Sequence, residues 1–285
     1  MKVSVIMPSF NQSAYVEAAI LSVLNQCGPS VELIFVDGNS TDDTMDKVLR
    51  YRDRMAYCIS EPDHGQSDAL AKGFALATGD FMTWLNTDDL LLPGALADLA
   101  HAHEVEPERQ WFLGNVVWID TQDIILHARR GEAYRGCGPR CGLLTAAGPS
   151  AFFSRELYEK VGGVNKELHY QMDTELWWRF MLAGEPFGRL RSYIWALRLH
   201  SEAKVSGDLF LDATDPKAIA VAAAKAREAE HIASLRAPIE LGIGKTARRL
   251  AATAQRAASL NYLRSVIESC RWQGRRVDEV FNGNI

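Results

Sequence analysis

The chain has 285 residues, of which 47% are hydrophobic and 24% charged, and it contains 21 Gly and 10 Pro. This composition is typical of an ordinary globular protein and excludes a collagen-like, disordered or membrane-embedded chain. The formal net charge is −5, so the whole molecule has no basic bias and no nucleic acid partner is expected.

The chain also lacks the sequence features of an exported or membrane-spanning protein. No apolar run approaches the roughly 18 residues needed to cross a bilayer. The cysteines are five in number and show no zinc-type spacing, which favours reduced thiols. We therefore expect a cytoplasmic location, and attachment to the inner face of the membrane stays open.

The first 90 residues alternate apolar, strand-like runs with segments of helical spacing. The expected strands cover 3–7, 31–36, 55–59 and 81–85, and the expected helices cover 13–26, 42–53 and 66–77. Parallel strands require crossover helices between them. The alternation therefore predicts an α/β fold with a parallel sheet covered on both faces, a Rossmann-like nucleotide-binding layer.

The rhythm changes after residue 93, where strands and helices no longer alternate. The expected elements are a helix over 93–103, an antiparallel hairpin of 111–119 and 122–128, a strand over 150–153, helices over 154–161 and 173–183, and an extended run over 188–199. The Gly-rich stretch 131–148 predicts no element, and a loop of that length is usually functional. Beyond about 207 the composition is Ala-rich and predicts helices near 215–235 and 245–273.

Two strand ends carry polar residues suited to binding. Asp37 follows strand 31–36, and Asn86, Thr87, Asp88 and Asp89 follow strand 81–85. Open α/β sheets bind ligands at the carboxyl ends of their strands, and carboxylate oxygens suit a hard divalent cation. At this point Asp37 also fits a cap of helix 42–53, and the two adjacent aspartates also fit a solvated turn.

Asp173 and His200 occupy two further positions of interest. Asp173 opens helix 173–183, where a carboxylate acts either as a base or as a cap. His200 ends an extended apolar run and is either a ligand or a hydrogen-bonded structural residue. No G-x-G-x-x-G follows the first strand and no P-loop motif occurs, which argues against a dinucleotide dehydrogenase and a P-loop enzyme.

The order and spacing of several short motifs give a stronger signal than any one of them. From Met1 to about His200 the chain resembles glycosyltransferase family 2, the inverting nucleotide-sugar transferases of the GT-A fold. The resemblance rests on Val5-Ile6-Met7-Pro8-Ser9-Phe10-Asn11, Phe35-Val36-Asp37-Gly38-Asn39-Ser40-Thr41-Asp42, Gly65-Gln66-Ser67-Asp68-Ala69-Leu70-Ala71-Lys72-Gly73, Ala77-Thr78-Gly79-Asp80, Trp84-Leu85-Asn86-Thr87-Asp88-Asp89, Phe152-Phe153-Ser154-Arg155-Glu156-Leu157, Lys160-Val161-Gly162-Gly163 and Leu168-His169-Tyr170-Gln171-Met172-Asp173.

The resemblance implies roles for individual residues. Asp173 matches the catalytic base, and Asp88, in Asn86-Thr87-Asp88, matches the metal ligand of the DxD element. His200 matches a second ligand of the metal or of the diphosphate. The remaining matched positions belong to the donor site, with Asp37 at the nucleobase: Pro8, Ser9, Asn11, Asp37, Asp68, Lys72 and Asn86. Asn86 replaces the first Asp of the element, which preserves a ribose contact and weakens the case for metal affinity.

The resemblance also implies the domains and the activity. A GT-A catalytic domain covers 1–206, with a nucleotide-sugar-binding half over 1–90 and an acceptor and catalytic half over 91–206, and a helical extension covers 207–285. The expected reaction is an inverting transfer, dependent on Mn²⁺ or Mg²⁺, from a nucleotide-diphosphate sugar, above all a UDP-sugar. The acceptor hydroxyl belongs to a glycan or lipid-linked molecule in surface polysaccharide or glycoconjugate synthesis.

Two other functions stay open from the sequence. One is a non-catalytic, sugar-nucleotide-binding scaffold. The other is a sugar-nucleotide nucleotidyltransferase, although Pro8-Ser9-Phe10-Asn11 stands where that enzyme carries a basic, Gly-rich loop. In the extension, nine Lys and Arg stand against two Glu between Arg236 and Arg276, which predicts contact with an anionic membrane. Packing on the catalytic domain or in a homodimer is the alternative.

Overall fold

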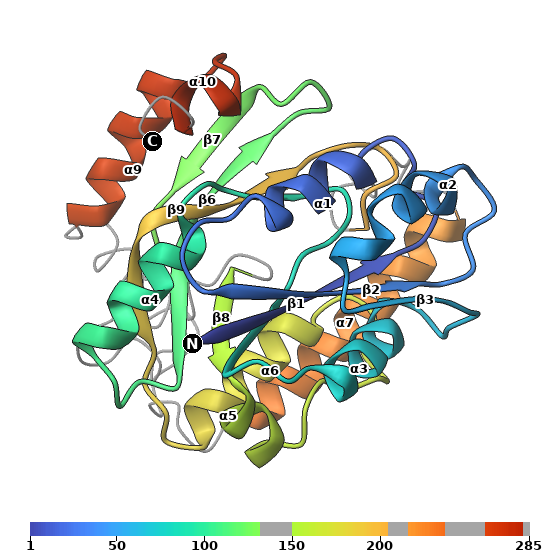
Figure 1. Ribbon diagram of the computed structural model, residues 1–285. Helices are drawn as coiled ribbons and strands as arrows, with labels where there is room; N and C mark the ends of the chain where they lie inside the picture. The colour runs from blue at the N-terminus through green and yellow to red at the C-terminus, as the bar shows by residue number, and fades with distance from the viewer. Residues whose placement is uncertain (132–149, 205–215, 237–259, 282–285) are drawn as a thin grey trace.

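The computed structural model describes residues 1–131, 150–204, 216–236 and 260–281. In these residues one mixed sheet runs in the order β3-β2-β1-β4-β8-β6-β9-β5, and β7 pairs with β6 (Figure 1). The strands are β1 (Lys2–Ser9), β2 (Ser30–Asp37), β3 (Tyr57–Ser60), β4 (Phe81–Trp84), β5 (Leu90–Leu91), β6 (Trp111–Ile119), β7 (Ile125–Arg129), β8 (Ala151–Ser154) and β9 (Gly188–Arg198). The predicted α/β class is confirmed.

The first four strands are parallel, as the alternation of strands and helices predicted. β1 pairs with β2 on one side and with β4 on the other, and β2 pairs with β3. The pairing of Ser9 with Asp37 brings the ends of β1 and β2 to the same sheet edge. Polar residues that follow these strands are therefore neighbours in space, although they lie far apart in sequence.

Helices cover both faces of the sheet. The bounds are α1 (Val16–Leu24), α2 (Thr44–Val48), α3 (Gln66–Leu76), α4 (Ala95–Val105), α5 (Arg155–Lys160) and α6 (Met172–Leu182). One apolar core joins α1, α2 and α4 to Val5 and Phe35, and another joins α3, α5 and α6 to Ile6 and Trp84. Successive strand residues thus enter opposite cores, which is why these strands read as continuous apolar runs.

Two predicted elements differ from the structure. The helix expected over 42–53 is the short α2 followed by a 3₁₀ helix over Leu49–Arg54. None of the 3₁₀ residues is buried, so no apolar face draws this segment onto the sheet as a regular α-helix. The second hairpin strand begins at Ile125 instead of 122, because the Asp120 carboxylate binds the amides of Gln122 and Ile124 in a turn.

A stack of aromatic rings fixes α6 against the sheet. The ring centroid of Trp177 on α6 lies 5.4 Å from that of Trp84 on β4 and 5.8 Å from that of Trp111 on β6. All three side chains are buried. Rigid, buried aromatic rings contribute large apolar areas and a specific geometry. The start of α6, where Asp173 lies, is therefore held in a defined position relative to β4.

The carboxyl-terminal helices lie at two places on the domain. α7 (Pro216–Arg236) packs against α6, whereas α9 (Leu260–Trp272) packs on β7 and is followed by α10 (Val277–Phe281) (Figure 1). The predicted loop over 131–148, apart from Gly131, and residues 245–259 of the last predicted helix lie outside the described residues. Among the helices that the structure describes, none has the length and apolar character that a bilayer crossing requires.

Candidate functional site

A cavity of about 910 Å³ opens at the carboxyl ends of β1 and β4, beside the start of α6. Seven of the residues singled out from the sequence line it: Pro8, Ser9, Asn86, Thr87, Asp88, Asp89 and Asp173. Three loops that the sequence separates by up to 165 residues thus meet around one space. The cavity is large enough for a nucleotide-sized ligand, because small-molecule sites commonly enclose 300–1,000 Å³.

Asp88 and His200 form a pair at the junction of β4 and β9. His200 Nε2 lies 3.1 Å from Asp88 Oδ2, and the imidazole is buried against the Tyr15 ring. Asp88 lines the cavity directly. His200 itself is not a lining residue, so its imidazole contacts the Asp88 carboxylate from behind the cavity wall. The metal site that the resemblance implied at this pair stays a prediction.

The neighbouring Asp89 is structural. It is buried and accepts hydrogen bonds from the Arg198 backbone nitrogen at 2.9 Å and from Asn86 Nδ2 at 3.1 Å. Arg198 also donates to the Asp88 carbonyl oxygen and forms an ion pair with Asp123. Burial, together with the negative charge of Asp88, raises the pKa of Asp89 well above its usual value. Asp89 thus joins β9 to the loop that presents Asp88.

In the described residues, no group of three or more His, Cys, Asp and Glu side chains forms a metal cage. A divalent cation would find two protein ligands here, Asp88 and His200, and would take its other ligands from a bound diphosphate and water. An imidazole ligand suits Mn²⁺ better than Mg²⁺, because Mg²⁺ prefers oxygen ligands. The residues present fit a metal held jointly by protein and substrate.

Asp37 lies behind the cavity wall and does not line it. Its carboxylate is fully buried and accepts hydrogen bonds from the Ser40 backbone nitrogen at 2.9 Å and from Ser60 Oγ at 2.7 Å. These contacts join the ends of β2 and β3. The cavity is lined here by Gly38 and Asp63, and a Cβ at Gly38 would lie 2.7 Å from Asp63 Oδ2. Asp63, which the sequence analysis did not single out, is thus the carboxylate that faces this end of the cavity.

Asn11, Asp68 and Lys72 also lie away from the cavity lining. Asn11 Oδ1 accepts a hydrogen bond from the Thr41 backbone nitrogen at 2.9 Å, which ties the loop after β1 to the loop after β2. On α3, Lys72 pairs with Glu61 at 2.8 Å, and Asp68 lies 3.4 Å from Lys166. The positive charges of Lys166 and Lys72 help to lower the pKa of Asp68. Donor binding by Asn11, Asp68 and Lys72 stays a prediction. In the structure their side chains contact neighbouring protein groups and hold the surrounding loops and α3 in place.

A polar chain crosses the cavity wall from Asn86 to Lys204. Gln66 Nε2 donates to Asn86 Oδ1 at 2.6 Å, and Lys204 Nζ donates to Gln66 Oε1 at 3.1 Å. The Lys204 ammonium also lies 5.7 Å from the centroid of the Tyr170 ring. Although the residue keeps exposed surface, desolvation by the protein around its ammonium group lowers the pKa of Lys204 to about 8. The sequence analysis gave neither Gln66 nor Lys204 a role.

Asp173 faces the cavity from the first turn of α6. Its Oδ1 accepts hydrogen bonds from the Thr174 backbone nitrogen at 2.6 Å and from Thr174 Oγ1 at 3.2 Å. Desolvation by burial raises the pKa of this carboxyl above its usual value, which brings it closer to the range suited to a general base. The positive charge of Lys204 acts in the opposite direction.

The segment before Asp173 is held by a residue of the carboxyl-terminal extension. Glu228 on α7 is buried, and its carboxylate accepts hydrogen bonds from the backbone nitrogens of His169, Tyr170 and Gln171 at 2.7, 2.9 and 2.8 Å. Its negative charge acts on the pKa of Lys204 in the raising direction, against the larger lowering by desolvation. Charge-assisted hydrogen bonds to backbone amides are strong. α7 therefore contributes directly to the geometry of this wall, and Glu228, within an Ala-rich helix and outside any motif, gave no sequence signal for it.

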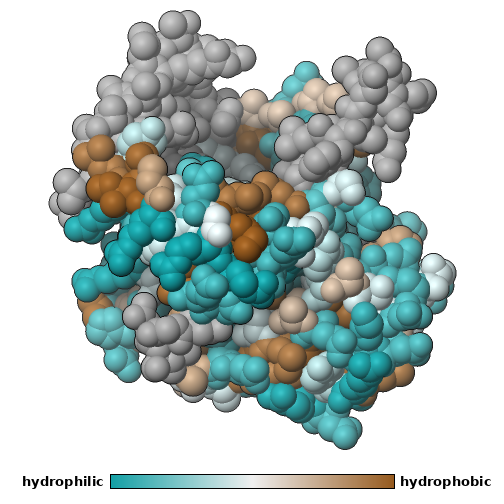
Figure 2. All heavy atoms as spheres, turned by 90° about the horizontal axis from the view of Figure 1, so that it is seen from above, coloured by the Kyte–Doolittle hydropathy of each residue, from teal (hydrophilic) through white to brown (hydrophobic). Residues whose placement is uncertain are grey.

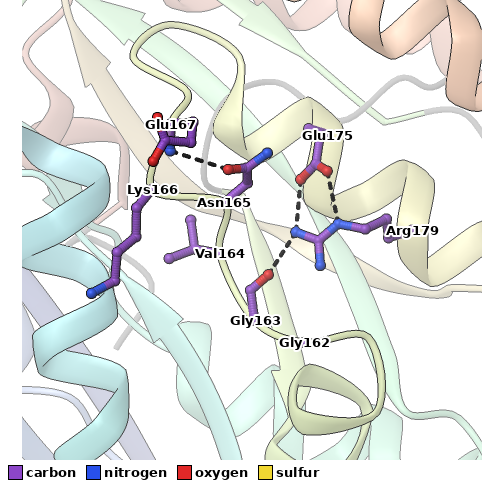
Figure 3. Close-up of a pocket in the computed structure, with 8 residues that line it drawn as sticks. All are labelled: Gly162, Gly163, Val164, Asn165, Lys166, Glu167, Glu175 and Arg179. Atoms are coloured by element: carbon purple, nitrogen blue, oxygen red, sulfur yellow. Dashed lines mark hydrogen bonds and ion pairs between the residues drawn. The ribbon is translucent and has the colours of Figure 1, made fainter.

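Glu175, two residues after Asp173 in the same helix, forms a structural ion pair. Its two oxygens lie 2.9 and 2.7 Å from Nε and Nη2 of Arg179, which also donates to the carbonyl oxygen of Gly163 (Figure 3). Arg179 Nη1 donates to the carbonyl oxygen of Val161. His231 on α7 lies 3.6 Å from the same carboxylate. Glu175 and Arg179 border a separate, smaller cavity of about 430 Å³. Glu175 is thus directed away from the larger cavity, and Asp173 is the carboxylate of α6 that faces it.

The architecture is that of the GT-A transferases. S. aureus TarS in complex with UDP-GlcNAc superimposes with a TM-score of 0.61 at 16% sequence identity, covering 87% of this chain and 69% of that chain. TarS in complex with UDP gives a TM-score of 0.56 at 19% identity, covering 71% of this chain and 62% of that chain. Residues 4–162, more than half of the chain, match the family model described as glycosyl transferase family 2. The chain belongs to this family.

Two named relatives act on lipid-linked sugars according to their descriptions. The chain is 39% identical over 102 residues to the GalNAc(5)-diNAcBac-PP-undecaprenol beta-1,3-glucosyltransferase of Campylobacter jejuni, covering 34% of this chain and 33% of the relative. It is 36% identical over 124 residues to the Escherichia coli UDP-Glc:alpha-D-GlcNAc-diphosphoundecaprenol beta-1,3-glucosyltransferase WfgD, covering 43% and 49%. The match spans about a third to a half of the length of these relatives.

Proposed function

We propose that this chain transfers a sugar, with inversion at the anomeric carbon, from a UDP-sugar to a hydroxyl group of a lipid-linked acceptor. The observation that carries the proposal is the cavity wall, on which Asp88, backed by its contact with His200, and the Asp173 carboxylate both lie. A charge-binding pair and a base on one cavity are what a sugar transfer from a diphosphate requires. The family membership supports the same reaction class.

The donor diphosphate would lie at Asp88 and His200. These residues would hold Mn²⁺ or Mg²⁺, which when bound neutralises the charge that develops on the leaving diphosphate. Lys204 adds a positive charge on the same wall, where it donates a hydrogen bond to Gln66. The uridine moiety is proposed because TarS forms complexes with UDP and with UDP-GlcNAc, and because the full name of WfgD gives UDP-Glc as its donor.

Asp173 would act as the general base. As the acceptor oxygen bonds to the anomeric carbon, the bond from that carbon to the diphosphate oxygen breaks, and the hydroxyl proton passes to the Asp173 carboxylate. The electron pair leaves with the diphosphate. A single displacement inverts the configuration. The raised pKa of Asp173 makes it a stronger base than an exposed carboxylate.

The proposed acceptor is a sugar on a polyprenyl diphosphate. This follows from the undecaprenol-linked acceptors in the descriptions of the C. jejuni and E. coli relatives. Such an acceptor is held in a lipid bilayer, so the proposal includes surface polysaccharide or glycoconjugate assembly at the inner face of the membrane.

The test is a donor screen followed by a product assay. UDP-, GDP- and dTDP-sugars are screened by thermal shift with and without Mn²⁺, because a ligand that binds only the folded state raises its stability. We expect a UDP-sugar to give the largest metal-dependent shift, and we expect a β-linked product from an α-linked donor by NMR. Binding that is equal with and without Mn²⁺ would contradict the metal site, and a retained anomeric configuration would contradict the single displacement.

A further inference from the structure

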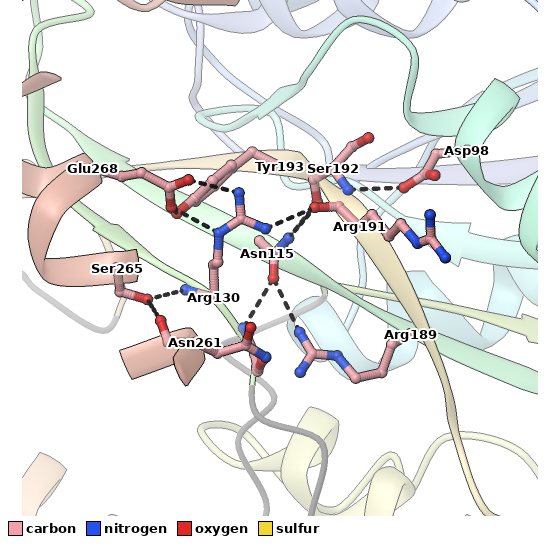
Figure 4. Close-up of polar contacts among 11 residues, drawn as sticks. Asp98, Asn115, Arg130, Arg189, Arg191, Ser192, Tyr193, Asn261, Ser265 and Glu268 are labelled. Atoms are coloured by element: carbon pink, nitrogen blue, oxygen red, sulfur yellow. Dashed lines mark hydrogen bonds and ion pairs between the residues drawn. The ribbon is translucent and has the colours of Figure 1, made fainter. Parts of the chain in front are cut away.

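Helix α9 turns its polar side toward the protein. Arg130, the residue after β7, forms an ion pair with Glu268 at 2.6 Å, and the Tyr193 hydroxyl donates to the same carboxylate at 2.6 Å (Figure 4). The hydroxyls of Ser265 and Ser269 are buried in the contact. The interface between α9 and the sheet is therefore built from hydroxyl and charged groups along most of the helix, and Trp272 at its end adds an aromatic contact with Tyr193, with ring centroids 5.1 Å apart.

The position of β7 explains this polar contact. β7 lies outside the main strand order of the sheet and pairs with β6 along one edge. The backbone groups along its other edge therefore need hydrogen-bond partners. Ser269 Oγ accepts from the Ala128 backbone nitrogen at 2.8 Å, and Ser265 Oγ accepts from the Arg130 backbone nitrogen at 2.7 Å. Two serines one helical turn apart thus satisfy two alternate amides of the edge.

The opposite face of α9 is apolar and open to solvent. Tyr262, Leu263, Val266 and Ile267 are 46%, 53%, 43% and 65% exposed. Their spacing of three and four residues places them on one side of the helix. Viewed from above, apolar surface gathers at the edge of the molecule on which Figure 1 places α9 (Figure 2). An amphipathic helix in water normally buries such a face, so this orientation calls for an apolar partner.

The charge around this face identifies the partner. Arg264 and Arg271 are exposed beside the apolar residues, and between Arg236 and Arg276 the sequence holds nine Lys and Arg against two Glu. The whole chain is nevertheless acidic, with a net charge of −5. A second copy of the chain would bring two basic segments together, whereas an anionic surface would neutralise them.

We propose that the outward face of α9, formed by Tyr262, Leu263, Val266 and Ile267, docks on an anionic lipid bilayer. The apolar side chains enter the boundary between head groups and acyl chains, and Arg264 and Arg271 lie at the phosphates. This inference goes beyond the proposed sugar transfer, because the contact needs neither donor nor acceptor.

The test uses the full chain and vesicles without any lipid-linked sugar. Co-sedimentation is measured with vesicles of an equal mixture of phosphatidylglycerol and phosphatidylcholine, and with phosphatidylcholine alone, in the absence of nucleotide. We expect binding to the anionic vesicles to be stronger, and we expect L263E/I267E to weaken it by about tenfold or more, because burial of these side chains drives insertion. The matched control is L49E/V105E, which changes two other apolar residues that are 56% and 64% exposed.

A second variant and a second measurement keep the test decisive. R264Q/R271Q should also lower binding to anionic vesicles, by about tenfold, while its stability stays near that of the unmodified chain. Equal binding to both kinds of vesicle, or equal losses in L49E/V105E, would overturn the proposal. A dimer in solution that L263E/I267E dissociates would assign the face to a second copy instead. D173N should bind vesicles normally, so failed catalysis and failed docking are distinguishable.

Discussion

Two carboxylates that line the larger cavity, Asp88 and Asp173, are held in different ways. Asp88 follows β4, and the buried Arg198 of β9 donates to its carbonyl oxygen and to that of Asp120. Asp173 lies at the start of α6, and the segment before it is held by one carboxylate, Glu228 of α7. The sheet thus fixes one side of the cavity, and a carboxyl-terminal helix fixes the other. The side of the cavity that carries Asp173 therefore depends on residues that are more distant in the sequence.

The largest expected effect is at Asp173. Asp173→Asn keeps the size of the side chain but removes the proton acceptor, so turnover should fall by on the order of 10²-fold or more. Donor affinity, measured by titration with UDP-sugar and Mn²⁺, should change little. The control is Glu167→Gln on the exposed loop nearby, which should keep full turnover. Normal turnover in the Asp173 variant would remove this residue from the reaction.

Asp88→Ala tests the side of the cavity that the sheet fixes. Loss of the carboxylate should weaken binding of the nucleotide diphosphate in Mn²⁺ by at least about tenfold. Binding without metal should be affected much less, and the unfolding temperature should stay close to that of the unmodified chain. If affinity in Mn²⁺ is unchanged, the diphosphate lies elsewhere.

Glu228 tests the dependence on α7 directly. Glu228→Ala removes the acceptor of three backbone amides and should lower both turnover, by about tenfold, and stability, by roughly 1.5–3 kcal/mol. Glu228→Gln keeps one acceptor oxygen and should recover part of both losses. Glu230→Gln on the exposed side of α7 is the control. The KM for the donor should move less than kcat, since Glu228 positions the segment before Asp173. Equal losses in all three variants would indicate a general effect on the helix.

The smallest expected effect is on the pH profile. Activity should fall at low pH as the Asp173 carboxylate gains a proton, and this limb should lie above 3.8, the ordinary pKa of the group, because burial raises it. Activity should also fall as pH rises through about 8, where Lys204 loses its charge.

Lys204→Arg sharpens the assignment of the alkaline limb. Arginine keeps its charge at every pH of interest, so the variant should retain activity above pH 8 relative to its own maximum. Lys166→Arg, at a lysine side chain that is 58% exposed, should leave the profile unchanged. An alkaline limb that persists in Lys204→Arg would assign it to another group.

The sequence predicted the parts of the fold that local patterns encode. The strands of the parallel half lie within about two residues of their predicted bounds, because each is an apolar run closed by polar or Gly residues. Asp88 and Asp173 were singled out as candidate site residues because Asp88 follows a strand and Asp173 opens a helix, each within a recognisable motif. The pattern did not reveal that Ser40 and Ser60 would engage Asp37, since such contacts depend on the register of β2 and β3.

The residues that were missed act across long sequence separations. Glu228 lies 57 residues after Gln171 in sequence, and Lys204 reaches Gln66 over 138 residues. Neither belongs to a short motif, and both contacts exist only once α7 and the end of β9 have packed beside α3 and α6. Likewise, the sequence predicted a helix near 245–273 but not which side of it would face the sheet.

The serines of α9 have a consequence for how the carboxyl-terminal region can be studied. Without residues 260–281, the Ala128 and Arg130 amides would lose their partners, and the free edge of β7 would become a template for strand addition between molecules. A shortened chain would then tend to aggregate through a surface that the full chain never presents. Point substitutions on the outward face of α9 avoid this artefact, because they leave the edge of β7 covered.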